Sequence, residues 1–389
     1  MDRKTKGRLA RDSDVEDVEV TGSRGSLVFG RHRKQYIDFM AGWCVGNLGW
    51  DQPAVRQAIE RFEGPDYVYP GYRYKAWDEL AELIAAVTPG KLACCFRATG
   101  GSEAVDLALQ AATIHTRRVK FLSLHGSYHG NTIACLSVGD GDREAVPNLL
   151  RACLKLKPPL TARTSDQVET ILQRRDVAAV ILEPISINLG VLVPEPAFIK
   201  RLRQLCTRTG TLLIADEVAS GFGRTGRLFA CEHFGLEPDM LCLAKAITAG
   251  GAPMGALVTT DAVGRSMEED GSFYSTYGWH PRSTAAAIAS LRWMTKNRRQ
   301  LLANVERLSG YFQKRLTAMG FGGTAELTIR GLAIGVDVGS ERRASDIHDD
   351  AREAGLLIST QGSRLLLLPA LNMPRSMAET GLDILERCL

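Results

Sequence analysis

The middle of the chain alternates between short apolar runs and segments of helical spacing. Apolar residues recur every three to four positions at 102–114, 165–174 and 196–209, which predicts amphipathic helices there. The apolar runs around these helices predict strands at 92–96, 119–124, 177–182, 212–215, 240–243 and 256–258. Buried strands that alternate with helices are typical of a largely parallel sheet covered on both faces. The pattern therefore predicts an α/β fold.

The two ends of the chain follow a different pattern. Residues 18–29 predict a strand, a turn and a second strand, and 36–38 extend the pairing. A long helical stretch at 281–319 leads to a strand-rich end with apolar runs at 332–338 and 365–368. We therefore expect a large α/β domain flanked by a smaller α+β domain that both chain ends build. The expected boundaries are 1–45 for the N-terminal segment of the small domain, 46–280 for the large domain and 281–389 for the C-terminal part of the small domain.

Composition and charge narrow the class of protein. The 389 residues include 48 basic and 44 acidic side chains, a net charge of +4, and 45% are hydrophobic. This composition is typical of a globular protein, and so weak a charge predicts neither nucleic acid nor a membrane surface as a partner. Residues 1–14 are polar and basic, which predicts a solvated arm and not a signal peptide. The nine cysteines are scattered, so we expect a cytoplasmic enzyme with reduced thiols.

Two predicted strand ends carry residues of matching chemistry. The strand at 212–215 ends in Asp216, and the strand at 240–243 runs into Lys245 and a glycine-rich loop. Ligands of parallel sheets bind at the carboxyl ends of the strands. A lysine that forms an imine with an aldehyde, and an aspartate that keeps a ring nitrogen protonated, are what a pyridoxal phosphate (PLP) enzyme requires. Taken singly, Asp216 is better explained as a turn cap and Lys245 as a surface lysine.

A third candidate is the segment Gly100-Gly101-Ser102, which opens a predicted helix. The free N–H groups of a helix N-terminus suit a phosphate, and glycine allows the backbone to approach it closely. A simple helix cap by Ser102 explains the same residues. The sequence leaves both interpretations open here.

Two other motifs have the spacing of a known type of binding site, but the residues around them do not fit that site. Residues 221–226 have the G-x-G-x-x-G spacing of dinucleotide-binding loops, but they lie beyond the strand end and no clear helix follows. His125 and His129 are four positions apart, as in a metal-binding pair on a helix. Gly126 and Gly130 favour a loop instead, and no third ligand is evident. The sequence therefore predicts neither a dinucleotide site nor a metal site.

The segment 216–256, DEVASGFGRTGRLFACEHFGLEPDMLCLAKAITAGGAPMGA, strongly resembles the signature of class III PLP-dependent aminotransferases. Further blocks resemble the same family in the same order, at 36–59, 99–112, 126–132, 181–190, 275–281 and 365–373. The resemblance covers nearly everything after residue 15. It implies the fold type I architecture, in which a large PLP-binding domain holds a mostly parallel seven-stranded sheet.

The resemblance also implies the cofactor and the residues that contact it. Lys245 would form the resting imine with PLP, and its freed amine would then act as the general base. Asp216 would pair with the ring nitrogen through a charge-assisted hydrogen bond. Thr276 would reach the phosphate site of a neighbouring subunit, which implies a homodimer with shared active sites. The other implied contacts are Gly101 and Ser102 at the phosphate, Tyr128 stacked on the ring with Val218 on its opposite face, and His129 and Glu183.

The substrate residues depart from those of the relatives that the chain resembles most, the acetylornithine and ornithine-type aminotransferases. Leu366 occupies the position of their carboxylate-binding arginine. Arg364 shares a strand face with it, about 7 Å away, and either replaces that arginine or is simply exposed. Asn131 replaces another substrate-binding arginine, and Asn188 stands where some members carry a glutamate. These losses disfavour a strict dicarboxylate specialist.

Trp43 or Cys44 is expected to line the entrance, as aromatic residues do in the ω-amine group of the family. We therefore predict a cytoplasmic, homodimeric class III aminotransferase. It would move an amino group from an ω-amino acid or amine to a 2-oxo acid, 2-oxoglutarate or pyruvate, in a ping-pong cycle. An aminomutase or lyase on the same fold is one alternative, which the intact SGFGRTG motif disfavours. A non-catalytic PLP-binding scaffold is another, which the complete Asp216–Lys245 pair disfavours.

Overall fold

A computed structural model describes residues 18–140, 145–321 and 326–389. Its largest sheet has seven strands in the order β4-β10-β9-β8-β7-β5-β6. β10 is antiparallel to both its neighbours, while β9, β8, β7, β5 and β6 pair in parallel. The prediction of a mostly parallel seven-stranded sheet is confirmed. The strands are β4 (Leu92–Ala98), β5 (Lys120–Leu124), β6 (Cys153–Leu156), β7 (Val177–Leu182), β8 (Leu212–Asp216), β9 (Met240–Leu243) and β10 (Gly255–Thr260).

Helices cover both faces of this sheet, because successive strand residues point to opposite sides. In β8, Leu213 and Ala215 pack into the cluster that contains α3, α6 and α7, whereas Leu212 and Ile214 pack into the cluster that contains α4, α5 and α8. The helices are α2 (Pro53–Glu60), α3 (Lys75–Val87), α4 (Gly101–Thr116), α5 (Ile133–Val138), α6 (Ala162–Leu172), α7 (Pro196–Thr209) and α8 (Asp261–Asp270). The edge strand β6 was not predicted, since three of its four residues are half-buried and it lacks a continuous apolar run.

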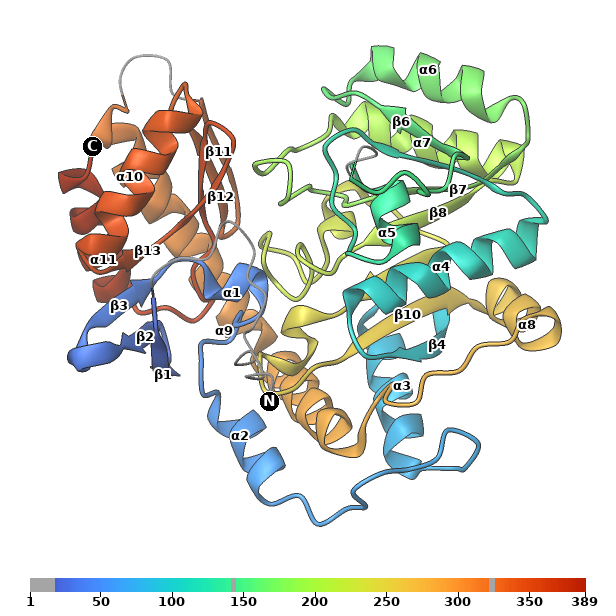
Figure 1. Cartoon of the computed structure of the whole chain (residues 1–389), viewed down its shortest axis with the longest axis horizontal. Helices are drawn as coiled ribbons and strands as arrows, with labels where there is room; N and C mark the ends of the chain where they lie inside the picture. Colours follow the sequence, from blue (N-terminus) through green and yellow to red (C-terminus); the bar gives the residue numbers. More distant parts are fainter. Residues whose placement is uncertain (1–17, 141–144, 322–325) are drawn as a thin grey trace, which may run out of the picture.

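Elements from residues 20–44 and 326–387 lie together on one side of the molecule, and the long helix α9 (Pro281–Met319) leads to this part from the large sheet (Figure 1). One small sheet has the order β1-β2-β3-β13, so the first strands pair with a strand from the last part of the chain. A second has the order β11-β12-β15-β14. The remaining elements are β1 (Val20–Arg24), β2 (Leu27–Gly30), β3 (Gln35–Asp38), α1 (Ala41–Cys44), β11 (Glu326–Arg330), β12 (Ala333–Asp337), α10 (Glu341–Glu353), β13 (Leu356–Leu357), β14 (Ser359–Gln361), β15 (Arg364–Leu367) and α11 (Arg375–Arg387).

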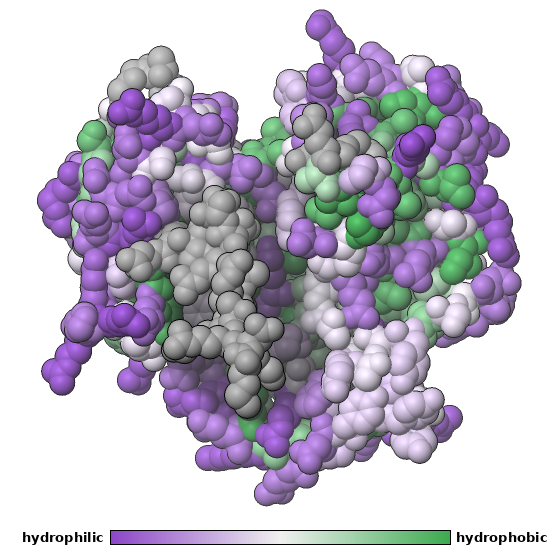
Figure 2. All heavy atoms as spheres, viewed as in Figure 1, coloured by the Kyte–Doolittle hydropathy of each residue, from purple (hydrophilic) through white to green (hydrophobic). Residues whose placement is uncertain are grey.

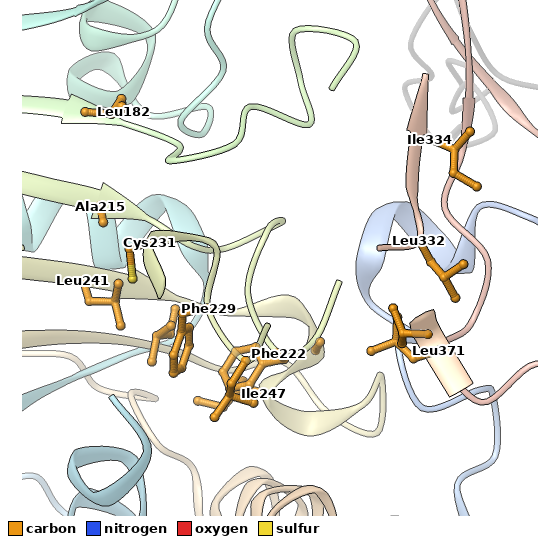
Figure 3. Packing of buried hydrophobic residues seen from close by; sticks show 14 of the residues in the cluster. Leu182, Ala215, Phe222, Phe229, Cys231, Leu241, Ile247, Leu332, Ile334 and Leu371 are labelled. Atoms are coloured by element: carbon orange, nitrogen blue, oxygen red, sulfur yellow. The ribbon is translucent and has the colours of Figure 1, made fainter. Parts of the chain in front are cut away.

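The main hydrophobic core continues from the large sheet into the part that the chain ends form. Figure 3 shows this continuity from Leu182, Ala215 and Leu241 on the strands, through Phe222 and Phe229, to Leu332, Ile334 and Leu371. The two parts of the molecule therefore share one core.

Arg224, which is fully buried, adds polar links across the same junction. Its guanidinium donates to the carbonyl oxygens of Leu332 at 2.9 Å and Pro369 at 2.6 Å, and to Asn47 Oδ1 at 2.5 Å. A planar guanidinium has enough fixed donors to bridge three chain segments at once.

Hydrophilic residues cover much of the face that carries α10 and α11, and hydrophobic side chains are more frequent over the part that carries α4 and α5 (Figure 2). No helix among the described residues is long and apolar enough to cross a bilayer. The predicted solvated arm, residues 1–14, lies outside the described residues.

Candidate active site

A cavity of about 520 Å³ opens at the carboxyl ends of the parallel strands. The ends of β4, β5, β7, β8 and β9 each contribute residues to its lining. Because parallel strands end at one edge of a sheet, residues far apart in the sequence meet there. The predicted residues that line it are Gly101 and Ser102 after β4, Tyr128 and His129 after β5, Glu183 and Asn188 after β7, Asp216 and Val218 at the end of β8, and Lys245 after β9.

Asp216 and His129 form a buried pair inside this cavity. His129 Nδ1 lies 2.7 Å from Asp216 Oδ2, and both side chains are almost fully buried. The backbone N–H of Val218 donates to Asp216 Oδ1 at 3.1 Å. Nε2 of His129 is buried and has no hydrogen-bond partner among the described residues. These contacts fix the Asp216 carboxylate in the lining of the cavity.

Glu183 is a second buried carboxyl in the lining, held by a tight local turn. Its Oε1 accepts from Ser186 Oγ at 2.8 Å and Asn188 Nδ2 at 2.9 Å, and its Oε2 accepts from the backbone N–H of Ile187 at 3.1 Å. Burial, and then the charge of Asp216, raise the pKa of Glu183 above its ordinary value. Its carboxyl is therefore more readily protonated than that of a free glutamate.

Lys245 is the first residue of a short 3-10 helix, Lys245–Thr248, directly after β9. Its φ is 47°, in the left-handed region that non-glycine residues rarely adopt. Such strain costs on the order of 1–3 kcal/mol and persists where the surroundings impose it. The half-buried Lys245 side chain belongs to the lining of the cavity.

The N-terminus of α4 provides a cradle of backbone. Gly100 is the N-cap, and no side chain bonds to the free N–H groups there. A Cβ on Gly101 would lie 3.1 Å from Val218 Cγ1, so only glycine fits without displacing its neighbour. Ser102 Oγ instead accepts from the backbone N–H of Asn131 at 3.2 Å. The alternative interpretation, in which Ser102 caps the helix, is therefore wrong, and the helix start is available to a phosphate.

These features fit PLP. The open helix start suits its phosphate, the buried Asp216 suits a protonated ring nitrogen, and Lys245 suits its aldehyde. All three lie on one cavity at the ends of a mostly parallel sheet. The fold and the site together define a PLP-dependent enzyme of fold type I.

Comparison with known proteins identifies the family. The sequence profile of "Aminotransferase class-III" matches residues 9–389. An acetylornithine aminotransferase of Methanosarcina mazei is 36% identical over 381 residues, which cover 96% of this chain and 92% of that protein. The chain belongs to the class III aminotransferases, and it is a PLP-dependent transaminating enzyme.

Solved structures agree with this assignment. A PLP-bound amine transaminase from an uncultivated Pseudomonas species is 28% identical, with a TM-score of 0.86 over 100% of this chain and 98% of that one. An omega-aminotransferase from Paracoccus denitrificans has a TM-score of 0.90 at 22% identity, over 98% of this chain and 96% of that one. The second likeness concerns the fold alone.

Among the predicted substrate residues, Asn188 belongs to the lining of the cavity in the part of the chain that the structure describes. Cys44 is fully buried in an apolar cluster with Ile187 and Leu366, and Trp43 packs against that cluster. Asn131 is exposed, and the contact toward the site is made by its backbone. Trp43, Cys44 and Asn131 are thus neighbours of the lining and not part of it.

Arg364 is held outside the described lining by two carboxylates. Its Nη2 donates to Glu326 Oε2 at 2.8 Å, and its Nε lies 3.5 Å from Asp337 Oδ2. Both ion pairs explain its orientation, since they satisfy a guanidinium that is otherwise near an apolar cluster.

Thr276 lines a second cavity of about 540 Å³, which shares the Thr99–Ser102 segment with the first.

The structure also places the two motifs whose spacing resembled a dinucleotide site and a metal site. Residues 221–226 form turns followed by a short 3-10 helix. His129 contacts Asp216, while His125 lies 3.4 Å from Asp140 on the surface. The described residues contain no group of three or more metal-ligating side chains.

Sequence reasoning did not identify several lining residues. These have small or apolar side chains with no chemical signature of their own: Val45, Thr99, Gly130, Ala219, Ala244 and the segment 250–254. It also noted Glu217 beside Asp216 without separating their roles. Glu217 is fully buried but accepts from Ser220 Oγ at 2.6 Å and the backbone N–H of Cys231 at 2.8 Å. Burial raises the pKa of Glu217 to about 7.

Proposed function

We propose that the enzyme transfers the amino group of an ω-amino acid or amine to a 2-oxo acid, such as 2-oxoglutarate or pyruvate, by a ping-pong cycle. One observation carries the proposal: Lys245 and Asp216 share a cavity whose described lining contains no arginine. A substrate carboxylate next to the reacting carbon would find no guanidinium fork there. The lack of a guanidinium weakens binding least for a donor whose amine lies far from any carboxylate.

We assign the roles of the lining residues in the same proposal. When bound, PLP supplies an aldehyde carbon that takes up the amino group and a ring that withdraws electrons. Gly101 and Ser102 would hold the phosphate, and Tyr128 and Val218 would enclose the ring. Asp216, which His129 orients, would pair with the ring nitrogen and keep it protonated.

Lys245 Nζ moves the proton in this proposal. It would take a proton from the amine-bearing carbon of the donor and later give a proton back, so one base would serve both half-reactions. Glu183 holds the neighbouring turn in place and presents Asn188 to the substrate. In this proposal, one group of lining residues holds the cofactor, and the residues that face the substrate carry little charge.

An absorbance titration tests the proposed activity. The purified protein with PLP is expected to lose its visible band with a donor and regain it with a 2-oxo acid. The panel comprises ornithine, 4-aminobutyrate, β-alanine and a simple arylalkylamine, and the donor that bleaches fastest identifies the donor class. Product analysis without an oxo acid distinguishes the alternatives, since a mutase or lyase would complete its reaction without an acceptor. A protein that stays unchanged with every amine would indicate a scaffold.

We also propose a homodimer with active sites shared across the interface. Exposed aromatic side chains gather on two segments, 67–72 and 273–277, and the second of these lines the second cavity through residues 274–277. The rings of Tyr67 and Tyr277 lie 6.0 Å apart, and those of Tyr69 and Tyr274 lie 6.4 Å apart. Contiguous exposed aromatic surface of this kind favours a protein partner.

Two further assignments belong to this proposal. We propose the cytoplasm as the location, because the nine cysteines are scattered along the sequence and predict no disulfide framework. We retain 1–45, 46–280 and 281–389 as the three segments of the two-domain division, with both chain ends in the small domain. The shared sheet of β3 and β13 supports this assignment.

A mixing experiment tests whether Thr276 serves the partner subunit. Thr276→Val alone is expected to weaken PLP binding by about 10-fold, the worth of one phosphate hydrogen bond. In a mixed dimer with Lys245→Ala, the subunit that carries Thr276→Val would keep its own Lys245 and receive an intact threonine. Its PLP affinity should therefore return to the wild-type value, as measured by fluorescence titration. If the mixed dimer keeps the weakened affinity, Thr276 acts within its own subunit.

A further inference from the structure

Four consecutive residues near the start of the chain adopt left-handed backbone conformations. The φ angles are 47° at Ala41, 58° at Gly42, 57° at Trp43 and 68° at Cys44. Three of the four are not glycine, and a left-handed turn of L-residues is unfavourable at each step. Strain of this kind persists when the surrounding structure imposes it, and it concentrates at functional sites.

Asp38, which is 3% exposed, holds this turn with both carboxylate oxygens. Oδ1 accepts from the backbone N–H groups of Met40 at 2.7 Å and Ala41 at 2.9 Å. Oδ2 accepts from Trp50 Nε1 at 2.6 Å. Three donors on one buried carboxylate, two of them at the start of the turn, tie the strained backbone to the indole ring.

Trp50 encloses the turn from the other side. A Cβ on Gly42 would lie 2.9 Å from Trp50 Cη2, and one on Gly46 would lie 3.2 Å from Trp50 Cε2. The indole ring therefore packs directly on the backbone of the turn. This contact requires glycine at both positions, because any side chain would displace the ring.

The turn and the indole ring both meet the lining of the active-site cavity. Val45, the next residue, lines it, and so does Gly250. A Cβ on Gly250 would lie 3.0 Å from Trp50 Cζ3 and 3.4 Å from Val45 Cγ1. Trp43 packs on the apolar cluster that includes Ala219, another lining residue. One wall of the cavity therefore rests on the turn that Asp38 holds.

We infer that Asp38 is a positioning residue that sets the size of donor this wall admits. It touches none of the residues assigned to PLP, so it acts through the turn, Val45 and Trp50. If the carboxylate is lost, the turn can relax toward right-handed conformations, and the Val45–Gly250 wall loses its support. The cavity then admits bulkier donors. This inference rests on the proposed function, because it concerns the donor of that same site.

The test compares Asp38→Asn and Trp50→Phe with wild type. In Asp38→Asn, the amide N–H₂ group faces other donors, the backbone N–H groups of the turn and Trp50 Nε1, so it cannot replace the lost carboxylate oxygen. In Trp50→Phe, the Nε1 donor is removed while a ring remains on the turn. The measured quantity is the donor ratio: kcat/KM for the largest donor that wild type accepts, divided by kcat/KM for the smallest. We expect this ratio to rise about 10-fold in Asp38→Asn, the factor for one charge-assisted hydrogen bond. Trp50→Phe should shift the ratio in the same direction by less.

A second readout does not depend on turnover. Amide hydrogen exchange over 38–46 should accelerate by about 10-fold or more in both variants, because exchange reports local opening. Asp51→Asn is the matched control: it makes the same chemical change nearby, where Asp51 pairs with Arg56 at 2.6 Å. It should leave the donor ratio and the exchange of the turn unchanged.

The outcomes distinguish a failure of the proposed function from a failure of the inference about Asp38. If wild type reacts with no amine, the proposed function fails. If wild type reacts and both folded variants keep its donor ratio within about 2-fold, Asp38 has no positioning role and the inference is overturned. Should Asp38→Asn fail to fold, Trp50→Phe alone decides, because its ring still fills the space between the turn and Gly250.

Discussion

Replacing Lys245 with alanine is expected to lower the rate of amino transfer by between about 100-fold and 10⁴-fold, the range for loss of a positioned general base. Lys245 lines the cavity at the end of β9, and its strained backbone holds it there. No other lysine belongs to the described lining, so no second amine can take over the proton. Single-turnover absorbance with the preferred donor measures the rate directly.

The control for this variant is Lys91→Ala, which removes an exposed lysine just before β4 and should keep the wild-type rate. Small amines added to the Lys245→Ala protein are expected to restore part of the rate, because a free base can enter the vacated space. Wild-type turnover in Lys245→Ala would show that another group moves the proton. The assignment of Lys245 would then be wrong, although the fold and the family would stand.

The elements of the large sheet could be predicted because burial leaves a strong trace in the sequence. A strand such as 177–182 is apolar at every position, since both faces of a parallel sheet are covered. The helix 281–319 was predicted with the bounds that the structure has, because a proline opens it and a glycine follows its end. Edge strand β6 left no comparable trace, since it is mostly half-buried and Lys155 interrupts its short apolar run.

That Lys245 and Asp216 meet in one cavity could be predicted, because each was singled out by a chemical requirement that few side chains meet. An imine needs a lysine, and a protonated ring nitrogen needs a carboxylate. The substrate residues have no such requirement. Whether Arg364 faces the cavity depends on its ion pairs with Glu326 and Asp337, which lie 38 and 27 positions away in sequence. Only the folded arrangement of β11, β12 and β15 reveals them.

The Asp38 turn illustrates the same limit. Nothing in the residues 41–44 signals a left-handed backbone, because Ala41, Trp43 and Cys44 all disfavour it. The conformation comes from contacts with Asp38 and Trp50, and nothing in the sequence around these two residues indicates that they make such contacts. Tertiary structure overrides local preference at the wall of the site, where such strain has a use.

Asp216→Asn is expected to lower the rate of amino transfer by about 100-fold or more, the cost of losing one preorganised charge at the reacting group. The amide keeps the size of the side chain and can still contact His129, but it carries no charge to hold the ring nitrogen protonated. PLP affinity should fall by about 10-fold to 100-fold, as expected for a hydrogen bond to a charged group. Stopped-flow absorbance and equilibrium dialysis measure the two effects separately.

Glu217→Gln is the matched control, since it makes the same change in the next residue. Glu217 accepts hydrogen bonds from Ser220 and Cys231 and is absent from the described lining of the cavity. With the pKa of Glu217 raised to about 7, the carboxyl is partly neutral already, so glutamine is a close substitute. Its rate should stay within about 3-fold of wild type. If both variants lost activity equally, the effect would come from disturbing the turn after β8, and Asp216 would have no separate electrostatic role.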